Sequence, residues 1–406
     1  MNLPVENKEV LTKSQWSNIL LWSAGKEKNR TDSKSGAWLK KRVWIIMLLP
    51  LSCIVSQIAL KNPAATEAVY STGIYRVISG FFGFLVSLLP KSVTETAIVV
   101  LPFLVLIYTV HSIVSIIRCK GIRLQQTIRF LSASMCIVSC TVFAFTAFCG
   151  LNYSRETFAD STGLLVEKSS LKELKEMCGG LIVHANELRG RLPENDAGVM
   201  ISGFSRLDDT ALKAQQIYRD FAQDYPTLSG YIPRPKPVRL SRAMSHLNIT
   251  GVYIPFMFEA NINADISEYL IPAVMMHEIS HFKGYMREEE ANFIAYLSCR
   301  SSGDIEFEYS GTMMALQNSL NALYKADPES HTALSAQISA GVQRDRAANR
   351  EYWKQFEGNA AKLSSKVNDA YLKTNHQTSG IQSYGQMVDL LLAEFRQGNF
   401  CNQTDK

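Results

Sequence analysis

Residues 277–299 read HEISHFKGYMREEEANFIAYLSC, and the first five of them form an HExxH motif. On a helix, His277 and His281 lie one turn apart on the same face, where two neutral imidazoles can bind one Zn²⁺. Glu278 then faces water at the metal and is the candidate general base. The sequence therefore predicts a helix that carries a zinc site together with its catalytic glutamate.

A third metal ligand must come from beyond this helix. A residue seven positions after His281 would lie about 10 Å further along an unbroken helix axis. Gly284 can end the helix, because glycine readily adopts the left-handed conformation. The chain can then turn back and present Glu288 at the start of a second helix, with Glu290 as the alternative ligand. A solvated acidic cluster at a helix N-terminus is the competing interpretation of these glutamates.

The residues after the turn resemble known zinc peptidases. The pattern Glu288-x-x-Ala291-Asn292 resembles the ExxA(D/N) segment of gluzincin metallopeptidases, in which that glutamate binds zinc. This resemblance implies that Glu288 is the third ligand and that Asn292 supports it from one turn away. Metzincins also have a glycine at the place of Gly284, but Arg287 stands here in place of their third histidine.

The first 150 residues contain apolar segments long enough to cross a bilayer. Three such spans are predicted at 43–60, 96–117 and 130–149. A shorter apolar segment, 74–89, carries Arg76 near its start and is predicted to lie at the membrane interface. Together these segments form a membrane domain over residues 43–149.

Lysine and arginine residues predict how this membrane domain is oriented. Residues 1–42 become basic towards their end, and the loop 118–129 carries Arg118, Lys120, Arg123 and Arg129. The positive-inside rule puts both segments in the cytoplasm. Two cytoplasmic segments need an even number of crossings between them, so residues 74–89 are not expected to cross. Residues 150–406 then form an extracytoplasmic domain.

Residues 150–406 are predicted to be mostly helical with a small β element. The best strand candidate is GVYIPFMFEANI, residues 251–262, and Pro255 confines it to a sheet edge or a bulge. An edge strand can pair with an extended substrate, although an ordinary hairpin fits the pattern equally well. Proline disfavours helix over 225–237, and helical periodicity covers 169–191, 210–222, 311–325, 345–374 and a last helix within 381–395.

Three further observations bear on chemistry. Tyr384, at the start of the last helix, is a candidate donor to an oxyanion, with plain capping-region packing as the alternative. Of the eight cysteines, Cys178, Cys299 and Cys401 lie outside the membrane, and nothing selects a disulfide among them. Glycine-rich phosphate loops and basic–aromatic patches are missing from the sequence, so no nucleic-acid partner is expected.

The order of these features resembles a bacterial membrane family known as domain-of-unknown-function 3810. The matching stretches are LNYSRETF, GVYIPFMFEANIN, the HEISH stretch and GIQSYGQMVDLLL. Met257 stands where this family usually has threonine. The resemblance implies a zinc metallopeptidase of gluzincin-like type, with no substrate specified.

The overall expectation is a mainly α protein. A bundle of three transmembrane helices precedes a mostly helical, zincin-like domain with a small β element. The expected function is a membrane-anchored, Zn²⁺-dependent metallopeptidase of the cell membrane. Its partners would be the lipid bilayer and a peptide or protein substrate at the cell envelope. The alternative is a non-catalytic, zinc-stabilised binding or sensor protein. An intramembrane protease is disfavoured, because Asp265 and Glu268 precede HEISH and charged residues follow it.

Overall fold

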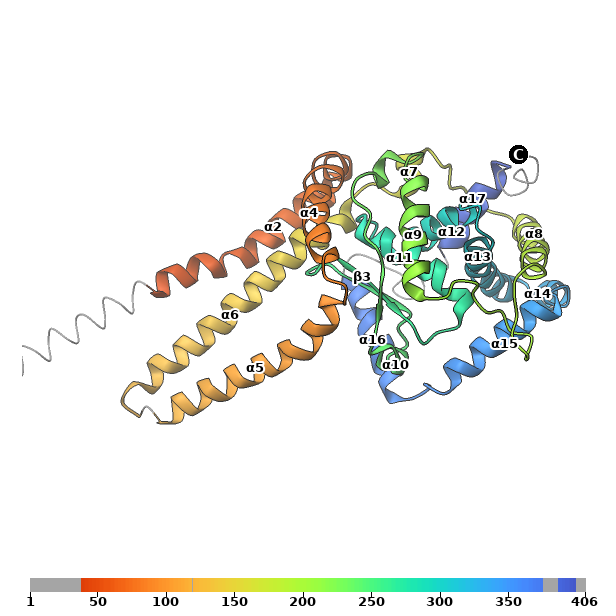
Figure 1. The fold of residues 1–406 in the computed structure, drawn as a ribbon. Helices are drawn as coiled ribbons and strands as arrows, with labels where there is room; N and C mark the ends of the chain where they lie inside the picture. Colours follow the sequence, from red (N-terminus) through yellow and green to blue (C-terminus); the bar gives the residue numbers. More distant parts are fainter. Residues whose placement is uncertain (1–37, 119, 375–385, 399–406) are drawn as a thin grey trace, which may run out of the picture. The chain divides into compact units, whose positions relative to one another are not determined.

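The computed structural model of the chain describes residues 38–118, 120–374 and 386–398. Helices dominate this part of the chain (Figure 1), as predicted. The chain divides into two compact units. Unit 1 comprises the residues up to Cys53 together with Tyr108–Phe143, and unit 2 comprises Ile54–Ile107 together with Ala144–Lys406.

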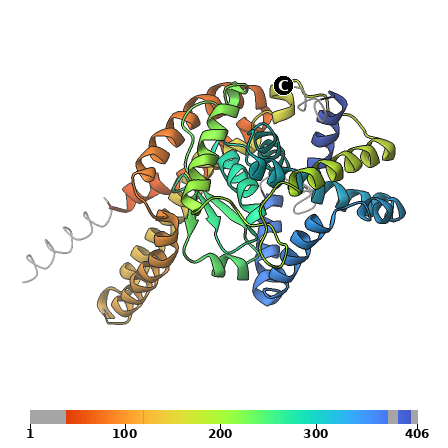
Figure 2. The same cartoon turned by 45° about the vertical axis from the view of Figure 1, so that its right-hand side comes forward.

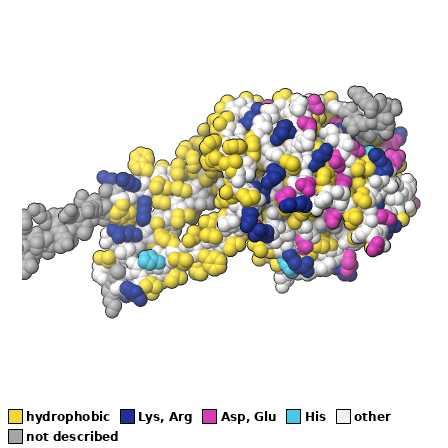
Figure 3. All heavy atoms as spheres, in the orientation of Figure 1, with side chains coloured by type: hydrophobic (Ala, Val, Ile, Leu, Met, Phe, Trp, Pro, Cys, Tyr) yellow, Lys and Arg dark blue, Asp and Glu magenta, His cyan; other side chains and the backbone are white. Residues whose placement is uncertain are grey.

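Unit 1 is built from parts of three apolar helices. These are the first helix, Trp38–Lys61, which includes α2 (Leu48–Lys61), then α5 (Val93–Arg118) and α6 (Arg123–Phe148). A short 3-10 helix, η2 (Lys120–Ile122), precedes α6. The guanidinium of Arg42 donates to the carbonyl of Arg129 and to the hydroxyl of Ser132, each at 2.7 Å. The basic start of the first helix therefore lies beside the basic start of α6, and Figure 3 shows lysine and arginine side chains gathered at that end of unit 1.

Four helices in the described part of the chain are long and apolar enough to cross a membrane, so the prediction that only three segments have this character was wrong. They are Trp38–Lys61, Pro63–Ser87, Val93–Arg118 and Arg123–Phe148. The unexpected helix, Pro63–Ser87, joins α3 (Pro63–Ala65), the π-helical η1 (Thr66–Ile74) and α4 (Tyr75–Ser87). In the sequence, the charged Arg76 interrupts the apolar residues of this segment. Its guanidinium donates to the carbonyl of Pro226 at 3.0 Å, so protein atoms accommodate the charge.

The helix Pro63–Ser87 belongs to unit 2 and packs along one face against the rest of that unit. Tyr75, Ser79 and Gly83 are buried on that face of α4. A Cβ atom on Gly83 would lie 2.7 Å from the ring of Phe282, so only glycine allows the helix to come this close. The same helix therefore forms part of the domain that carries the HEISH motif.

Helix α11 (Ile271–Phe282) is the central helix of unit 2 (Figures 1 and 2). All of its 12 residues except His277 are buried, which is typical of a helix enclosed by others. It packs against α9, α12, α13 and two strands. The helices of the domain are α7 (Phe158–Thr162), α8 (Leu171–Arg189), α9 (Leu207–Phe221), α10 (Ser241–His246), α12 (Glu288–Arg300), α13 (Ile305–Ala326), α14 (Pro328–Ser335), α15 (Ala340–Lys354), α16 (Asn359–Thr374) and α17 (Met387–Arg396), with 3-10 turns η3 (Gly150–Ser154), η4 (Pro226–Leu228) and η5 (Glu268–Leu270).

The small β element is a three-stranded sheet with the order β1-β3-β2. Strand β1 (Lys236–Val238) pairs in parallel with β3 (Glu259–Asn263), and β2 (Gly251–Ile254) pairs antiparallel with β3. Of the two interpretations of residues 251–262, the hairpin is the one that the structure bears out, because the chain reverses after Ile254 and Phe258 adopts a positive φ of 49° in the turn. The predicted edge position holds for β2, which lies at the edge of this sheet.

Two other sequence predictions need adjustment. The helix predicted over 345–374 is two helices, α15 and α16, separated at residues 355–358. Gly358 lies in this break, where a residue with low helix propensity interrupts the pattern. Cys178 and Cys299 are buried free thiols in the structure, and Cys401 lies outside the described residues.

Candidate metal centre and catalytic cleft

Helix α11 ends in a turn that reverses the chain directly after HEISH. The amide of Gly284 donates to the carbonyl of His281 at 2.9 Å, and the amide of Tyr285 donates to the carbonyl of Ser280 at 3.1 Å. This pair of hydrogen bonds is the Schellman arrangement, which needs a left-handed residue at its centre. Gly284 supplies that residue with a φ of 88°. The predicted break at Gly284 is therefore present, and α12 starts four residues later at Glu288.

The reversal brings Glu288 against the two histidines. Its Oε2 atom lies 3.3 Å from Nε2 of His277, and its Oε1 atom lies 3.8 Å from Nε2 of His281. One ligand atom from each residue lies within 4.8 Å of the other two. Within the described ranges, this is the one group of three histidine, cysteine or acidic residues that comes this close.

Glu290, the alternative ligand, has a different environment. Its Oε1 atom accepts a hydrogen bond from the backbone amide of Phe158 at 2.7 Å, at the start of α7. The guanidinium of Arg287 lies 3.3 Å from the same oxygen. Glu290 is 3% exposed, so it is a buried cap for another helix.

Charge and burial oppose each other at two residues of the cluster, Glu288 and His281. Burial disfavours ionisation of Glu288, but hydrogen bonds from the two imidazoles outweigh it and hold its pKa well below the usual range. Burial likewise disfavours the charged form of His281, but the Glu288 carboxylate outweighs this effect and raises the pKa of His281 to about 9. An incoming metal ion would replace the proton that the anionic carboxylate attracts to His281.

The two histidine rings are fixed differently. Nδ1 of His281 lies 2.8 Å from the carbonyl of Tyr285 and can donate to it, so that Nε2 is the ring atom that faces Glu288 and is available to a metal ion. Nδ1 of His277 is buried and has no hydrogen-bond partner among the described residues. The ring centroids are 4.5 Å apart, with the planes nearly perpendicular at 86°.

Glu278 lies on the same helix and is 4% exposed. Its buried Oε2 atom has no hydrogen-bond partner among the described residues. Burial raises the pKa of this carboxyl, the two histidines oppose the rise, and the Glu288 carboxylate adds to it. Strand β2 passes close by: a Cβ atom on Gly251 would lie 2.5 Å from Oε1 of Glu278. A glycine is therefore required where the edge strand meets the candidate base.

These residues line a pocket of about 390 Å³. One wall is strand β2 with the turn that follows it, and the other walls come from α11, α16 and the end of α6. The lining includes His277, Glu278, His281, Glu288, Phe145, Cys149, Tyr153, Pro255, Phe256, Asn368 and Tyr371. The pocket thus combines the metal cluster with an edge strand on one side and apolar side chains on another.

Two tyrosines in this pocket were not singled out from the sequence. The hydroxyl of Tyr153 donates to the hydroxyl of Tyr371 at 3.1 Å, and Sγ of Cys149 lies 3.7 Å from the Tyr371 hydroxyl. Tyr153 belongs to the LNYSRETF stretch, which carried the family resemblance but no chemical motif of its own. Tyr384, the predicted oxyanion donor, lies outside the described residues.

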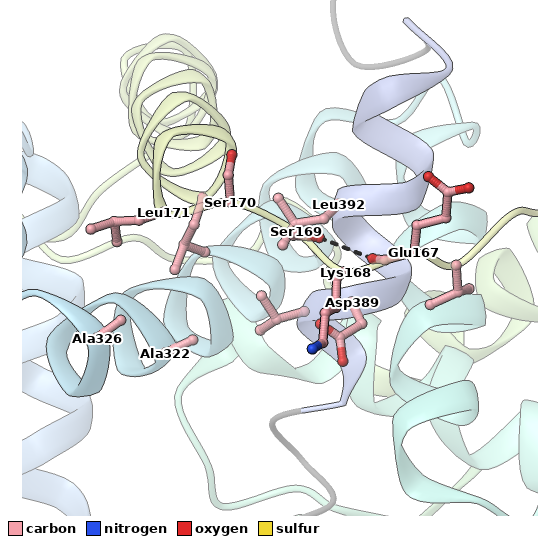
Figure 4. A pocket seen from close by; sticks show the side chains of 12 residues that line it. Glu167, Lys168, Ser169, Ser170, Leu171, Ala322, Ala326, Asp389 and Leu392 are labelled. Carbon is pink, nitrogen blue, oxygen red and sulfur yellow. Dashed lines mark hydrogen bonds between the residues drawn. The ribbon is translucent and has the colours of Figure 1, made fainter.

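Another hollow, of about 570 Å³, lies between the start of α8 and helices α13 and α17 (Figure 4). It is lined by Lys168, Asp389 and mostly apolar side chains, and its lining contains no histidine or cysteine. The hydroxyl of Ser169 donates to the carbonyl of Glu167 at 3.4 Å across its rim. This hollow therefore lacks a donor set for zinc and is not the candidate centre.

Comparisons with known proteins bear on the family alone. Searches of curated proteins and of solved structures gave no match. A family model described as a protein of unknown function, DUF3810, matches residues 70–392. The matched stretch includes the helix that packs on Phe282, the sheet, the metal cluster and α16. Because the match covers most of its length, the chain belongs to the DUF3810 family.

Proposed function

We propose that the chain is a membrane-anchored, zinc-dependent metallopeptidase that hydrolyses peptide bonds outside the cytoplasm. One observation carries this proposal. The cluster of His277, His281 and Glu288 lies in a pocket beside a buried glutamate, Glu278, whose Oε2 atom has no partner among the described residues. A site that only stabilised the fold would have no use for such a carboxylate.

The residues present fit a zinc ion. Two imidazole nitrogens and one carboxylate form the donor set of peptidase zinc sites, which keep a further position open. The carbonyl of Tyr285 orients His281 so that Nε2 is the free ligand atom, as is usual for metal-binding histidines. Zn²⁺ held there would polarise the scissile carbonyl and lower the pKa of water.

Glu278 would act as the general base in this chemistry. It accepts a proton from the attacking water and then passes it to the leaving amine. Burial raises its pKa toward the working pH, which suits a group that must both take and return a proton. The edge strand β2 would pair with an extended substrate beside it. Tyr153, Tyr371 and the predicted Tyr384 are the candidate hydroxyl donors to the oxyanion.

The basic residues support an extracytoplasmic position for the cleft. The guanidinium of Arg42 donates a hydrogen bond to the carbonyl of Arg129, so the two basic segments lie together. They would then share one side of the membrane, which the positive-inside rule assigns to the cytoplasm. The chain leaves that side in the first helix and returns to it in α5. The helix Pro63–Ser87 between them would then begin and end on the outer side. It would lie there against the domain through Tyr75, Ser79 and Gly83.

The test uses the full chain with bound zinc in lipid nanodiscs and a quenched-fluorescence peptide library. The wild-type protein should cleave peptides, and Glu278→Gln should retain zinc but lose nearly all turnover, because an amide cannot accept the proton. Equal zinc content without turnover in either protein would favour the alternative, a zinc-stabilised binding or sensor protein. Wild-type turnover by Glu278→Gln would defeat the mechanism.

A further inference from the structure

The candidate cleft is built onto the end of a membrane-length helix. Phe145 and Cys149 line the same pocket as His277 and Glu278. Phe145 lies 15 residues after Phe130, the first apolar residue that follows the basic start of α6. At the rise of an α-helix this is about 22 Å, which is most of the way across the hydrocarbon core of a bilayer. The pocket therefore begins at the end of α6 that is remote from its basic start.

The turn that follows the edge strand β2 also contacts the end of α6. Phe258, in the turn after β2, is buried, and its ring centroid lies 5.1 Å from that of Phe148 at the end of α6. The rings of Phe82 and Tyr75 in α4 also contact it, with centroids at 5.6 and 6.4 Å. These contacts hold the turn between β2 and β3 against the last residues of α6.

A second membrane-length helix, α5, contacts the sheet through strand β3. Glu259, the first residue of β3, accepts hydrogen bonds from the backbone amides of Val93 and Thr94, at 3.1 and 2.8 Å. These are the first amides of α5, so the carboxylate caps that helix. Lys236 of β1 lies 2.7 Å from the same carboxylate and compensates its charge. The sheet that forms one wall of the cleft is thus attached to the ends of two membrane-length helices.

The surface around this end of unit 2 is apolar. Phe256, which lines the pocket, is 42% exposed. On the face of α4 that points away from the domain, Phe81 is 58% and Leu88 is 64% exposed. Exposed aromatic and aliphatic side chains on a helix whose other face is packed are typical of contact with a lipid surface.

We infer that the substrates are polypeptides anchored in the same membrane, cut close to the point where they leave the bilayer. This inference rests on the proposed peptidase function. A polypeptide fits better than a lipid, because β2 lies at the edge of its sheet and can pair with an extended chain. An anchored chain arrives at the membrane surface at millimolar effective concentration, whereas a soluble protein must bring a loop there by diffusion.

The test compares three forms of one reporter, a disordered polypeptide of about thirty residues with mixed composition. The first form follows directly on a single transmembrane helix, and the second lacks that helix. The third has a helical spacer of about twenty residues after the transmembrane helix, which lifts the reporter by about 30 Å. All three are mixed with the zinc-loaded full chain in liposomes, and products are mapped by mass spectrometry.

The directly anchored reporter should be cleaved at least about ten-fold faster than the free reporter at equal concentration. Its cuts should fall within about ten residues of the membrane, a reach of about 33 Å in extended conformation. The spacer should abolish cleavage of the reporter. Equal rates for the anchored and free forms, cleavage throughout the lifted form, or hydrolysis of liposome lipids instead of peptide would each overturn the inference.

Failure of the inference can be distinguished from failure of the proposed function. Cleavage that depends on Glu278 but ignores anchoring would leave the peptidase standing and reject the anchored substrate. If none of the forms is cut, or if Glu278→Gln cuts them as fast as wild type, the proposed function falls and the inference falls with it.

A second measurement does not depend on turnover. Phe256→Cys is labelled with a fluorophore in a full-length background without Cys53, Cys119, Cys136, Cys140 and Cys401, and is quenched with nitroxide lipids. The matched control places the label at Tyr324, an exposed residue of α13. We expect strong quenching at 256 and little at 324. Equal weak quenching at both positions would show that the cleft does not lie at the bilayer.

Discussion

The carboxylate of Glu67 in η1 forms a buried ion pair with the guanidinium of Arg155, with an Oε1–Nη2 distance of 2.6 Å and an Oε2–Nε distance of 2.7 Å. The same guanidinium donates through Nη1 to the carbonyl of Lys283 at 3.0 Å and lies 3.8 Å from the ring centroid of Tyr285. These last two residues flank Gly284, and the carbonyl of Tyr285 is the partner of His281. The ion pair therefore connects the helix Pro63–Ser87 to the turn that orients a candidate zinc ligand.

Removing one member of this pair should be costly. Glu67→Gln or Arg155→Met alone leaves one buried charge without its partner, and such changes destabilise proteins by about 3–5 kcal/mol. The double variant removes both charges and should lose less than the two single variants combined. Thermal unfolding of the full-length protein in detergent measures this. Single variants that melt with the wild type would show that the pair carries no stability.

The metal ligands can be separated from their acidic neighbours. His277→Ala, His281→Ala and Glu288→Ala should each strongly reduce the zinc bound per chain, measured by elemental analysis of the purified full-length protein. Glu290→Ala is the matched control from the same turn. Because Glu290 caps α7 through the amide of Phe158, its removal should lower stability by about 1 kcal/mol and leave the zinc content unchanged. A loss of zinc in Glu290→Ala alone would reverse the assignment.

Gly251 should be essential for turnover without being needed for metal. A methyl group there would lie 2.5 Å from Oε1 of Glu278 and 2.7 Å from Cγ1 of Val274, so the base must move. A misplacement of about 1 Å can lower a rate by about 10²-fold. Gly251→Ala should therefore lower kcat by about that factor while zinc content stays at the wild-type level. Gly179→Ala, at a position with no atom near its Cβ, should keep full activity.

The environment of Glu259 predicts that the folded protein loses stability at acidic pH. Burial disfavours its ionisation, but hydrogen bonds from Lys236 and Thr94 outweigh this and lower its pKa. A carboxylate with a depressed pKa stabilises the fold above its unfolded value of about 4.3, and this contribution is lost as the pH falls below it. The difference in melting temperature between wild type and Glu259→Gln should therefore be largest near pH 6 and shrink towards pH 3. A difference independent of pH would reject this role.

The parts of the fold that the sequence predicted are those with a local cause. The segment from α11 to α12 follows from helical periodicity, from Gly284 at the break and from Glu288 four residues later. All of these features lie within one short stretch of sequence. The edge position of β2 was also predictable, because Pro255 limits pairing beyond Ile254. The sequence left open whether these residues turn back, because the ring contacts of Phe258 in the turn, with Phe148 and Phe82, come from distant helices.

The parts that the sequence missed depend on distant partners. In the sequence, Arg76 is a charge that interrupts an apolar segment. In the structure, its guanidinium donates to the carbonyl of Pro226, which is 150 residues later in the chain. Glu67 and Arg155 are 88 residues apart and belong to no motif, so nothing local marks them as a pair. The sequence favoured Glu288 over Glu290 as the third ligand, but the partner of Glu290, the amide of Phe158, is 132 residues away in the chain and could not be predicted.

The cap on α5 has a consequence for how the protein is made. The first amides of this helix find their acceptor in Glu259, which is 166 residues later in the chain than Val93. While the ribosome is still synthesising the intervening segment, the inserted helix has an unfinished end. The start of α5 is therefore completed only after β3 has been synthesised and has paired in the sheet. In a chain that stops before Glu259, water would have to serve as the acceptor for these amides.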